Sequence, residues 1–185
     1  MGKNRLGENG LGYLSRYELA RLLRIIKARD NEFYHLVYIA YLHGLRVSEV
    51  LQLKSTDYNL AEKKVVIRRL KGSFTTIQPA NEVELNYVRL SKSNRLFHLS
   101  RATADRKFKK FCSMANIEKN RSYIHILKHS CAVHLLQSGS DLYTIKKTLG
   151  HKDLKSTLVY LKYVDKNIDK AIMLLEQGLL SRGLR

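Results

Sequence analysis

The fold is decided by residues 62–79, which read EKKVVIRRLKGSFTTIQP. Three β-branched residues occupy 65–67, a Lys-Gly turn signal follows at 71–72, and Phe74 begins a second extended run that closes at Pro79. This pattern predicts a two-strand antiparallel hairpin. On both sides of the hairpin the apolar residues recur at helical spacing. We therefore expect a mainly α-helical chain with a small antiparallel β-hairpin or sheet, an α+β fold.

The helices flanking the hairpin are read from apolar stripes and capping signals. Ser15 and Glu18 have the spacing of a capping box, which places the start of the first helix at Ser15. The apolar residues from Leu19 to Ile26 then form one face of that helix. The other helices are expected at approximately 33–43, 46–53, 81–91, 101–116, 126–138, 141–149, 153–164 and 167–180.

The charge balance points to a polyanionic partner. The chain has 185 residues, with 34 Lys+Arg against 16 Asp+Glu, and a formal net charge of +18. An enzyme for small metabolites has no need of this self-repulsion, whereas a nucleic acid offsets it. Basic residues gather in the hairpin and in the helix at 101–116, and a solvated edge strand also uses lysine against aggregation. The nucleic-acid-binding candidates are Lys63, Lys64, Arg68, Arg69, Arg106, Lys107, Lys109 and Lys110.

Other protein classes are excluded by what the sequence lacks. Cys112 and Cys131 are the two cysteines, too few for a disulfide scaffold and typical of a reducing compartment. No run of 18 apolar residues could cross a membrane, and residues 1–15 lack the apolar core of a signal peptide. We expect a cytoplasmic protein that associates with nucleic acid.

Four short segments carry the chemistry when they are taken together. They are GLRVSEV at 44–50, Lys71 in the hairpin turn, HILKHS at 125–130, and LGH at 149–151 with a tyrosine nine residues after its histidine. Each segment alone is a weak signal, but the ordered set resembles the tyrosine recombinases, the phage-integrase family of site-specific DNA recombinases. The resemblance covers about residues 15–165. The hairpin and the short chain look most like the small recombinases that switch fimbrial promoters.

The resemblance implies a metal-free transesterification on double-stranded DNA, with no cofactor. Tyr160 would attack a phosphodiester and form a 3′-phosphotyrosyl link. Arg46 would bind two non-bridging oxygens, and His151 would hydrogen-bond another phosphate oxygen. Lys71 would protonate the leaving 5′-oxygen, and His125 would help to deprotonate the tyrosine. Fixed cations suit this reaction because the transition state carries more negative charge than the phosphodiester.

One position departs from the family pattern. The motif that begins at His125 usually reads His-x-x-Arg, and here the second cation is Lys128. Lysine keeps the charge but lacks the planar two-pronged donor of arginine. We expect Lys128 to contact the scissile phosphate in a slower reaction, and Lys128→Arg to preserve or raise cleavage. The alternative is a catalytically weakened DNA-binding protein derived from the same fold.

Several of these residues have a second interpretation. Tyr163 lies three residues after Tyr160 and is the competing nucleophile. His125 and His129 have the spacing of a zinc pair, although the intervening residues do not form the His-Glu-x-x-His motif and no third ligand is evident. Lys64 or Arg69 could supply the acid in place of the hairpin-turn lysine. A topoisomerase-like enzyme with the same chemistry is a further functional alternative.

The domain organisation follows from the extent of the resemblance. We expect a flexible leader at 1–14, a DNA breaking-rejoining domain at 15–166, and a C-terminal helix and tail at 167–185. In the family a segment after the nucleophile often docks on a neighbouring protomer, which implies a synaptic tetramer on DNA and a monomer or weak oligomer in its absence. Most members also carry an N-terminal clamp domain, so the chain is either a minimal recombinase or a fragment. The docking stripe would be Ile168, Ile172, Leu175 and Leu179.

Overall fold

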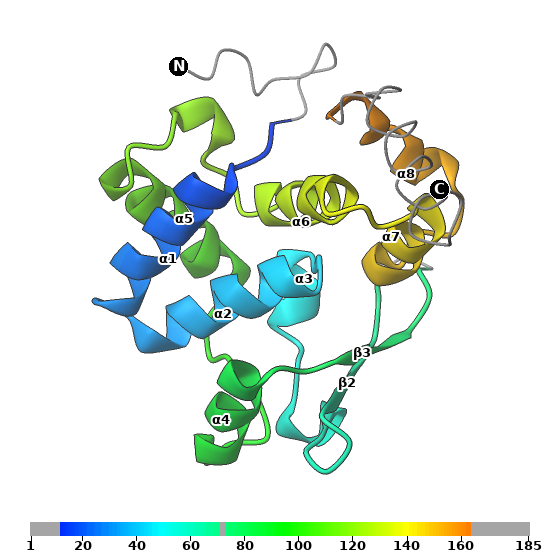
Figure 1. Cartoon of the computed structure of the whole chain (residues 1–185). Coiled ribbons are helices and arrows are strands. Elements are labelled where there is room, and N and C mark those ends of the chain that lie inside the picture. The colour runs from blue at the N-terminus through cyan, green and yellow to red at the C-terminus, as the bar shows by residue number, and fades with distance from the viewer. Residues whose placement is uncertain (1–11, 71–72, 164–185) are drawn as a thin grey trace, which may run out of the picture.

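The computed structural model describes residues 12–70 and 73–163, which form a helical body with a small sheet at one end (Figure 1). The sheet has three antiparallel strands in the order β1-β2-β3. The strands are β1 (Tyr58–Asn59), β2 (Lys64–Ile67) and β3 (Thr76–Pro79). The α-helices are α1 (Arg16–Lys27), α2 (Asn31–Leu42), α3 (Val47–Val50), α4 (Glu82–Leu90), α5 (Arg101–Met114), α6 (Ile126–Gln137), α7 (Leu142–Leu149) and α8 (Lys155–Leu158). Short 3₁₀ turns are η1 (Ser55–Asp57), η2 (Lys119–Arg121) and η3 (Leu161–Tyr163).

Side-chain caps fix where the helices begin. The predicted capping box is confirmed: the Glu18 backbone N–H donates to Ser15 Oγ at 3.2 Å, and the Ser15 N–H donates to Glu18 Oε2 at 2.8 Å. Such reciprocal bonds satisfy two of the N–H groups that a helix start leaves unpaired. Four further helices begin at a polar residue whose side chain accepts from a backbone N–H in the first turn. These residues are Asp30, Asn81, Ser100 and Asp141.

The predicted hairpin is confirmed, and a third strand makes the sheet larger than predicted. Val65 pairs with Gln78 and Val66 with Ile77, and the short strand β1 adds to the free edge of β2. Successive side chains of a strand point to opposite faces, so every second residue is buried. Along β2 and just beyond it, 65, 67 and 69 are buried while 64 and 68 are exposed. This alternation decides the roles of the two arginines that follow the strand.

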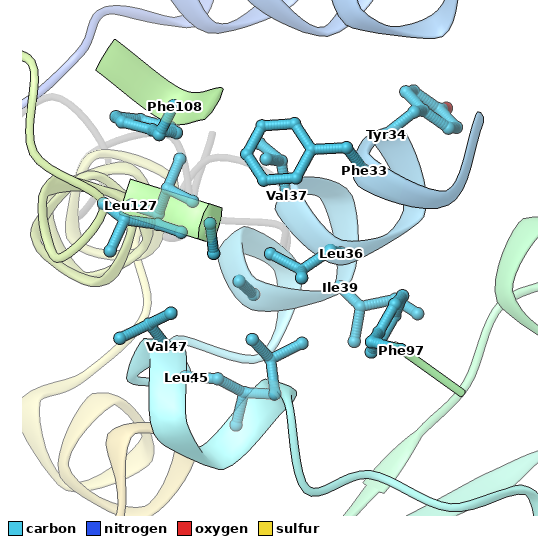
Figure 2. Packing of buried hydrophobic residues seen from close by; sticks show 14 of the residues in the cluster. Phe33, Tyr34, Leu36, Val37, Ile39, Leu45, Val47, Phe97, Phe108 and Leu127 are labelled. Atoms are coloured by element: carbon cyan, nitrogen blue, oxygen red, sulfur yellow. The ribbon is translucent and has the colours of Figure 1, made fainter. Parts of the chain in front are cut away.

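Most of the apolar burial surrounds α2 (Figure 2). Phe33, Leu36 and Ile39 of this helix are fully buried, in one cluster with Phe108 of α5 and Leu127 of α6, and Ile39 lies beside Phe97. We call this cluster the apolar core. A second, smaller group lies where α6, α7 and α8 meet, and we call it the C-terminal cluster. Its buried members are Cys131, Ala132, Val133, Ile145, Leu149 and Tyr160. The helix α6 belongs to both groups and connects them.

Some predicted boundaries are wrong. The helix expected at 153–164 is broken, because α8 ends at Leu158 and a turn containing Tyr160 leads into η3. The leader expected at 1–14 is wrong at its end: Leu14 is fully buried, and its N–H donates to Ser130 Oγ at 2.8 Å. The helix expected at 167–180 lies outside the described residues. Within the described ranges, no helix is long and apolar enough to cross a membrane.

Candidate active site

The first site element is the sharp turn between α2 and α3. Gly44 adopts a left-handed conformation with φ 57°, and a side chain there would collide with Leu149 of α7. Glycine is therefore required at this position, because the backbone is left-handed and because it comes close to α7. The turn places Arg46 at the start of α3, where its side chain is 33% exposed. The guanidinium is thus held in the protein surface with one side open to solvent.

A buried carboxylate fixes Arg46 in place. Glu49 Oε1 accepts from Arg46 Nη1 at 2.7 Å, and Glu49 Oε2 accepts from the Arg46 backbone N–H at 2.9 Å. The same Oε2 accepts from Arg69 Nη1 at 3.0 Å. Burial acts to raise the pKa of Glu49, but the bonds from Arg46 and the charge of Arg69 outweigh burial and lower it. Glu49 is therefore an anion that holds two arginines.

Lys128 projects from α6 into the protein interior. Its side chain is 2% exposed, and Nζ donates to the Leu149 backbone oxygen at 2.8 Å. Burial, followed by repulsion from Arg69 and Arg46, lowers the pKa of Lys128 to about 7. In this conformation the ammonium caps the end of α7. Contact between Lys128 and a scissile phosphate stays a prediction, and it requires the amine to leave the Leu149 carbonyl.

The end of α7 presents His151. Gly150 caps the helix in a left-handed conformation with φ 68°, and the chain turns so that His151 Nδ1 lies 3.0 Å from Thr157 Oγ1. Thr157 is fully buried and belongs to α8. Burial, with the charges of Lys128 and Arg46, lowers the pKa of His151 to about 4. The imidazole is therefore neutral at pH 7, which suits a hydrogen bond better than a charge pair.

Tyr160 is buried in the turn that follows α8. It is 3% exposed, and its hydroxyl lies 3.0 Å from Nδ1 of His129. Burial raises the pKa of the Tyr160 phenol, and burial followed by the charge of His125 lowers the pKa of His129 to about 4. The rings of His125 and His129 meet edge to face with their centroids 4.7 Å apart. The hydroxyl is thus paired with His129, whereas the family resemblance implied that His125 would help to deprotonate it.

These contacts join residues from distant parts of the chain into one site. Arg46 is joined through Glu49 and Arg69 to the end of α7, where Lys128 and His151 lie. Burial, followed by the charges of Lys128 and Arg46, lowers the pKa of His125. A pocket of about 410 Å³ opens beside this site between β3 and α7. Its lining is Phe74, Thr75, Thr76, Ile77, Tyr143, Lys146, Lys147, Gly150 and His151.

Lys71 is the remaining predicted catalytic residue, and a zinc pair is the alternative interpretation of His125 and His129. Lys71 lies outside the described residues, so its role stays a prediction from the sequence. His125 and His129 are neighbours, as the alternative zinc pair requires. Within 12–70 and 73–163, however, no group of three or more His, Cys, Asp or Glu side chains could hold a metal ion.

The predicted DNA-binding residues of the hairpin do not all face solvent. Lys63, Lys64 and Arg68 are exposed, and each pairs with a carboxylate of the same chain: Glu82, Glu62 and Asp57, respectively. The prediction for Arg69 is wrong. The Arg69 side chain is 0% exposed, and its Nη1 and Nη2 nitrogens donate to Glu49 and to backbone carbonyls. It sits on the buried face of the strand and presents no charge to DNA.

The predicted DNA-binding residues of α5 are mostly exposed. Arg106, Lys109 and Lys110 face solvent, whereas Lys107 is partly buried and its Nζ lies 2.6 Å from Asp30 Oδ2. Lys107 therefore links α5 to the start of α2 as well as carrying charge. Contact between these residues and DNA stays a prediction.

Sequence reasoning missed the roles of three residues of the site and misassigned a fourth, Arg69. Glu49 and Thr157 hold Arg46 and His151, and His129 holds the tyrosine hydroxyl. Spacing along a helix could have found Glu49 and His129, whereas no sequence signal marks Thr157. Arg46 and Glu49 have the spacing at which side chains of one helical turn meet, and His129 lies one turn after His125. For Arg69 the signal is strand alternation, which puts it on the same face as Val65 and Ile67.

Comparison with known proteins adds independent information. The family model described as "Phage integrase family" matches residues 13–167. Type 1 fimbriae regulatory protein FimE of Escherichia coli is 31% identical over 153 residues, covering 72% of this chain and 74% of FimE. Tyrosine recombinase XerA of Thermococcus onnurineus is 30% identical over 176 residues, covering 85% of this chain and 60% of XerA. The catalytic domain of bacteriophage HP1 integrase has the same fold, with a TM-score of 0.72 at 23% identity, covering 95% of this chain and 99% of that domain.

Proposed function

Because the chain belongs to the phage integrase family, whose members recombine DNA at specific sites through a phosphotyrosine intermediate, we propose that it is an active DNA strand transferase with Tyr160 as nucleophile. The observation that carries the proposal is the joining of Arg46, Lys128 and His151 around the end of α7, beside a tyrosine paired with His129. A basic site with a phenol at its edge is what attack on a phosphodiester needs.

The proposed reaction replaces one phosphate ester by another, so the energy of the phosphodiester bond is kept in the phosphotyrosyl link. The Tyr160 oxygen forms a bond to phosphorus, its proton passes to a neighbouring base, and the bond from phosphorus to the 5′-oxygen breaks. In the closed conformation His129 is the neutral base within hydrogen-bond distance of the hydroxyl. Lys71 supplies the proton to the 5′-oxygen. A 5′-hydroxyl then attacks the phosphotyrosyl link and releases the tyrosine, which reverses these steps. Strand exchange therefore needs no external energy source.

The binding of the phosphate falls to Arg46 and His151. The guanidinium of Arg46 is open to solvent on one side, and it can give a bidentate pair of hydrogen bonds to two oxygens. His151 is neutral and gives one hydrogen bond. Donors that are already fixed when charge develops lower the barrier without reorganising, and Glu49 and Thr157 fix these two.

The described conformation has the nucleophile closed. At 3% exposure the phenol cannot reach a phosphorus atom outside the protein, and burial disfavours the phenolate. The turn between α8 and η3 therefore moves outward before attack. Tyr13 holds this turn from the other side, because its ring packs edge to face on Tyr163 with centroids 5.2 Å apart. We propose that DNA and neighbouring protomers release the turn, and that the working form is a tetramer on two duplexes.

The experiment is covalent trapping on DNA of unknown sequence. A library of duplexes, each nicked beside a randomised region, is incubated with the protein. A cut near the nick releases a short fragment, so the phosphotyrosyl adduct cannot religate. Adducts that survive denaturing detergent are isolated and sequenced, which yields the preferred duplex. We expect a salt-sensitive adduct at one site, since phosphate contacts carry most of the affinity.

Two tyrosine variants identify the nucleophile. Tyr160→Phe should abolish the adduct, with a loss of at least about a thousandfold. Tyr163→Phe is the matched control, three residues away in the same segment, and it should still form the adduct. An adduct from Tyr160→Phe would move the nucleophile elsewhere. Salt-sensitive binding with no adduct in the wild type would favour the DNA-binding alternative, which the burial of Tyr160 and the lysine at 128 also fit.

A further inference from the structure

Arg69 occupies an unusual position for a residue at the end of a surface hairpin strand. Its side chain is fully buried, and its guanidinium bonds to three separate parts of the chain. Nη1 donates to the Gly44 backbone oxygen and to Glu49 Oε2, each at 3.0 Å. Nη2 donates to the His43 backbone oxygen at 2.9 Å and also to the Thr148 backbone oxygen. One side chain therefore contacts the turn before Arg46, the carboxylate that holds Arg46, and the end of α7.

Arg69 also packs tightly against the residue at the end of α7. A Cβ at Gly150 would lie 2.9 Å from both Cγ and Nε of Arg69. The arginine thus crosses directly over the residue before His151, and glycine at 150 leaves room for it. Lys128 completes the arrangement by bonding the Leu149 oxygen. Consecutive carbonyls at the end of α7 are held by a guanidinium and an ammonium, where the helix dipole favours cations.

We propose that Arg69 is a positioning residue, which holds Arg46 and His151 at the spacing that one phosphate requires. The proposal rests on the proposed function, because it concerns the phosphate contacts of that reaction. Within the described residues the Arg46 turn meets the end of α7 through the packing of Gly44 against Leu149, and Arg69 with Glu49 adds the hydrogen bonds and the ion pair that join the two. A shift of about 1 Å at such contacts can lower a rate about a hundredfold.

The variant Arg69→Lys tests this geometry while keeping the positive charge beside Glu49. A single ammonium cannot reproduce the two-pronged contacts, so Arg46 and His151 lose their fixed spacing. We expect cleavage of the selected duplex to fall about ten- to a hundredfold, with DNA affinity nearly unchanged since the side chain does not reach DNA. Loss of folded protein would also lower cleavage, so the rate alone does not decide the matter.

The deciding readout is a chemical change in the DNA. When a methylphosphonate replaces the scissile phosphate, the oxygen charge that Arg46 neutralises is absent. The ratio of the methylphosphonate rate to the phosphate rate is measured within one protein preparation, so the unfolded fraction cancels. Arg46→Ala sets the benchmark with a rise in this ratio of about tenfold or more over wild type. Arg69→Lys should raise the ratio in the same direction, by at least about fivefold.

The chain offers a matched control in a second buried arginine–glutamate pair. Arg121 is 6% exposed and bonds Glu18 with two nitrogens, at 3.0 and 3.2 Å. Arg121→Lys loses a comparable buried fork, yet it should keep the wild-type ratio. Gly150→Ala is the second test variant, since its methyl group displaces Arg69 without removing it, and it should raise the ratio as Arg69→Lys does.

The outcomes separate the inference from the function on which it rests. A wild type that forms no adduct on the phosphate duplex overturns the proposed function and the inference with it. A reactive wild type with an unchanged ratio in both Arg69→Lys and Gly150→Ala overturns the inference alone. A raised ratio in Arg121→Lys also overturns it, because the effect would then belong to any loss of buried structure.

Discussion

In the apolar core, side chains from α1, α2, α5 and α6 bury one another, and its aromatic members stack, as Phe33 does on Phe111 with ring centroids 5.7 Å apart. Around the C-terminal cluster the contacts are of another kind. An ammonium bonds a carbonyl, imidazoles bond hydroxyls, and a guanidinium bridges turns. The stabilisation from apolar burial does not depend on the direction of contact, whereas the strength of a hydrogen bond depends on its angle. The region of the proposed active site is therefore the region held by directional contacts, and the apolar core serves as its platform.

The largest expected difference between the two regions is in stability. Phe33→Ala removes a fully buried ring and should lower the free energy of unfolding by about 3–5 kcal/mol. Tyr160→Phe removes only a hydroxyl bonded to His129, and it should cost about 1 kcal/mol. Urea denaturation of both variants measures this. Equal losses would mean that the tyrosine is an ordinary core residue and that the comparison between the regions fails.

A second test concerns the shape of the space around Lys128. The sequence alone predicts that Lys128→Arg preserves or raises cleavage, because arginine restores the fork. The described packing reverses that expectation: a larger guanidinium would have to fit a slot that is 2% exposed, beside Arg69. We expect a loss of about 1–3 kcal/mol in unfolding free energy, together with slower adduct formation. Lys128→Met, of similar length and uncharged, is the control for volume: it loses only the bond to the Leu149 oxygen and should cost about 1 kcal/mol. Faster cleavage by Lys128→Arg would restore the prediction from the sequence.

A third test uses pH, because buried neutral imidazoles titrate on unfolding. Burial, followed by the charge of Arg16, lowers the pKa of His134 to about 4, from about 6.5 in an unfolded chain. The unfolded state then binds more protons between these values. Stability is fully present above about pH 6.5 and is lost as the pH falls toward 4. From pH 7.5 to 5.5 this histidine should account for about 1 kcal/mol. His134→Gln should flatten the pH dependence by that amount, and an unchanged slope would count against a neutral buried ring.

The smallest expected effect concerns the turn that holds Tyr160. Tyr13→Leu removes an edge-to-face contact with Tyr163 that is worth roughly 0.5–1 kcal/mol. If release of this turn precedes attack, the open form becomes more populated and adduct formation should rise about two- to fivefold. Samples of the reaction on the nicked duplex, quenched at successive times, measure this rate. A slower rate would mean that Tyr13 supports the active position of the turn rather than the closed one.

Sequence reasoning found the fold because its signals are local. The Ser15 capping box, the hairpin and the stripe from Leu19 to Ile26 each depend on neighbours a few residues apart, and the structure agrees with them. It missed the break after Leu158, since helical periodicity does not reveal a turn that tertiary contacts impose. The result is a tyrosine in a turn between α8 and η3, where a continuous helix was expected.

The site was harder to predict, because its contacts join residues far apart in the chain. Arg69 meets Thr148 across 79 positions, and His129 meets Tyr160 across 31. Motif order names candidate residues but does not say which side chain faces which. That information lies partly in strand alternation, which separates the exposed Arg68 from the buried Arg69. The rest depends on packing, as with Lys128 and the end of α7.

The exposed cations in the described part of the hairpin, Lys63, Lys64 and Arg68, are paired with the chain's own carboxylates. Lys63 lies 2.8 Å from Glu82, and Lys64 lies 2.7 Å from Glu62. A phosphate that approaches either lysine exchanges one anion for another, so this part of the surface contributes little to counterion release. The steep salt dependence expected of so basic a protein would come instead from exposed cations such as Lys109 and Lys110, for which no carboxylate partner lies among the described residues. Glu62 and Glu82 would then compete with the DNA backbone for these lysines. Binding would be weaker for any duplex whose phosphates do not come close enough to displace the two carboxylates.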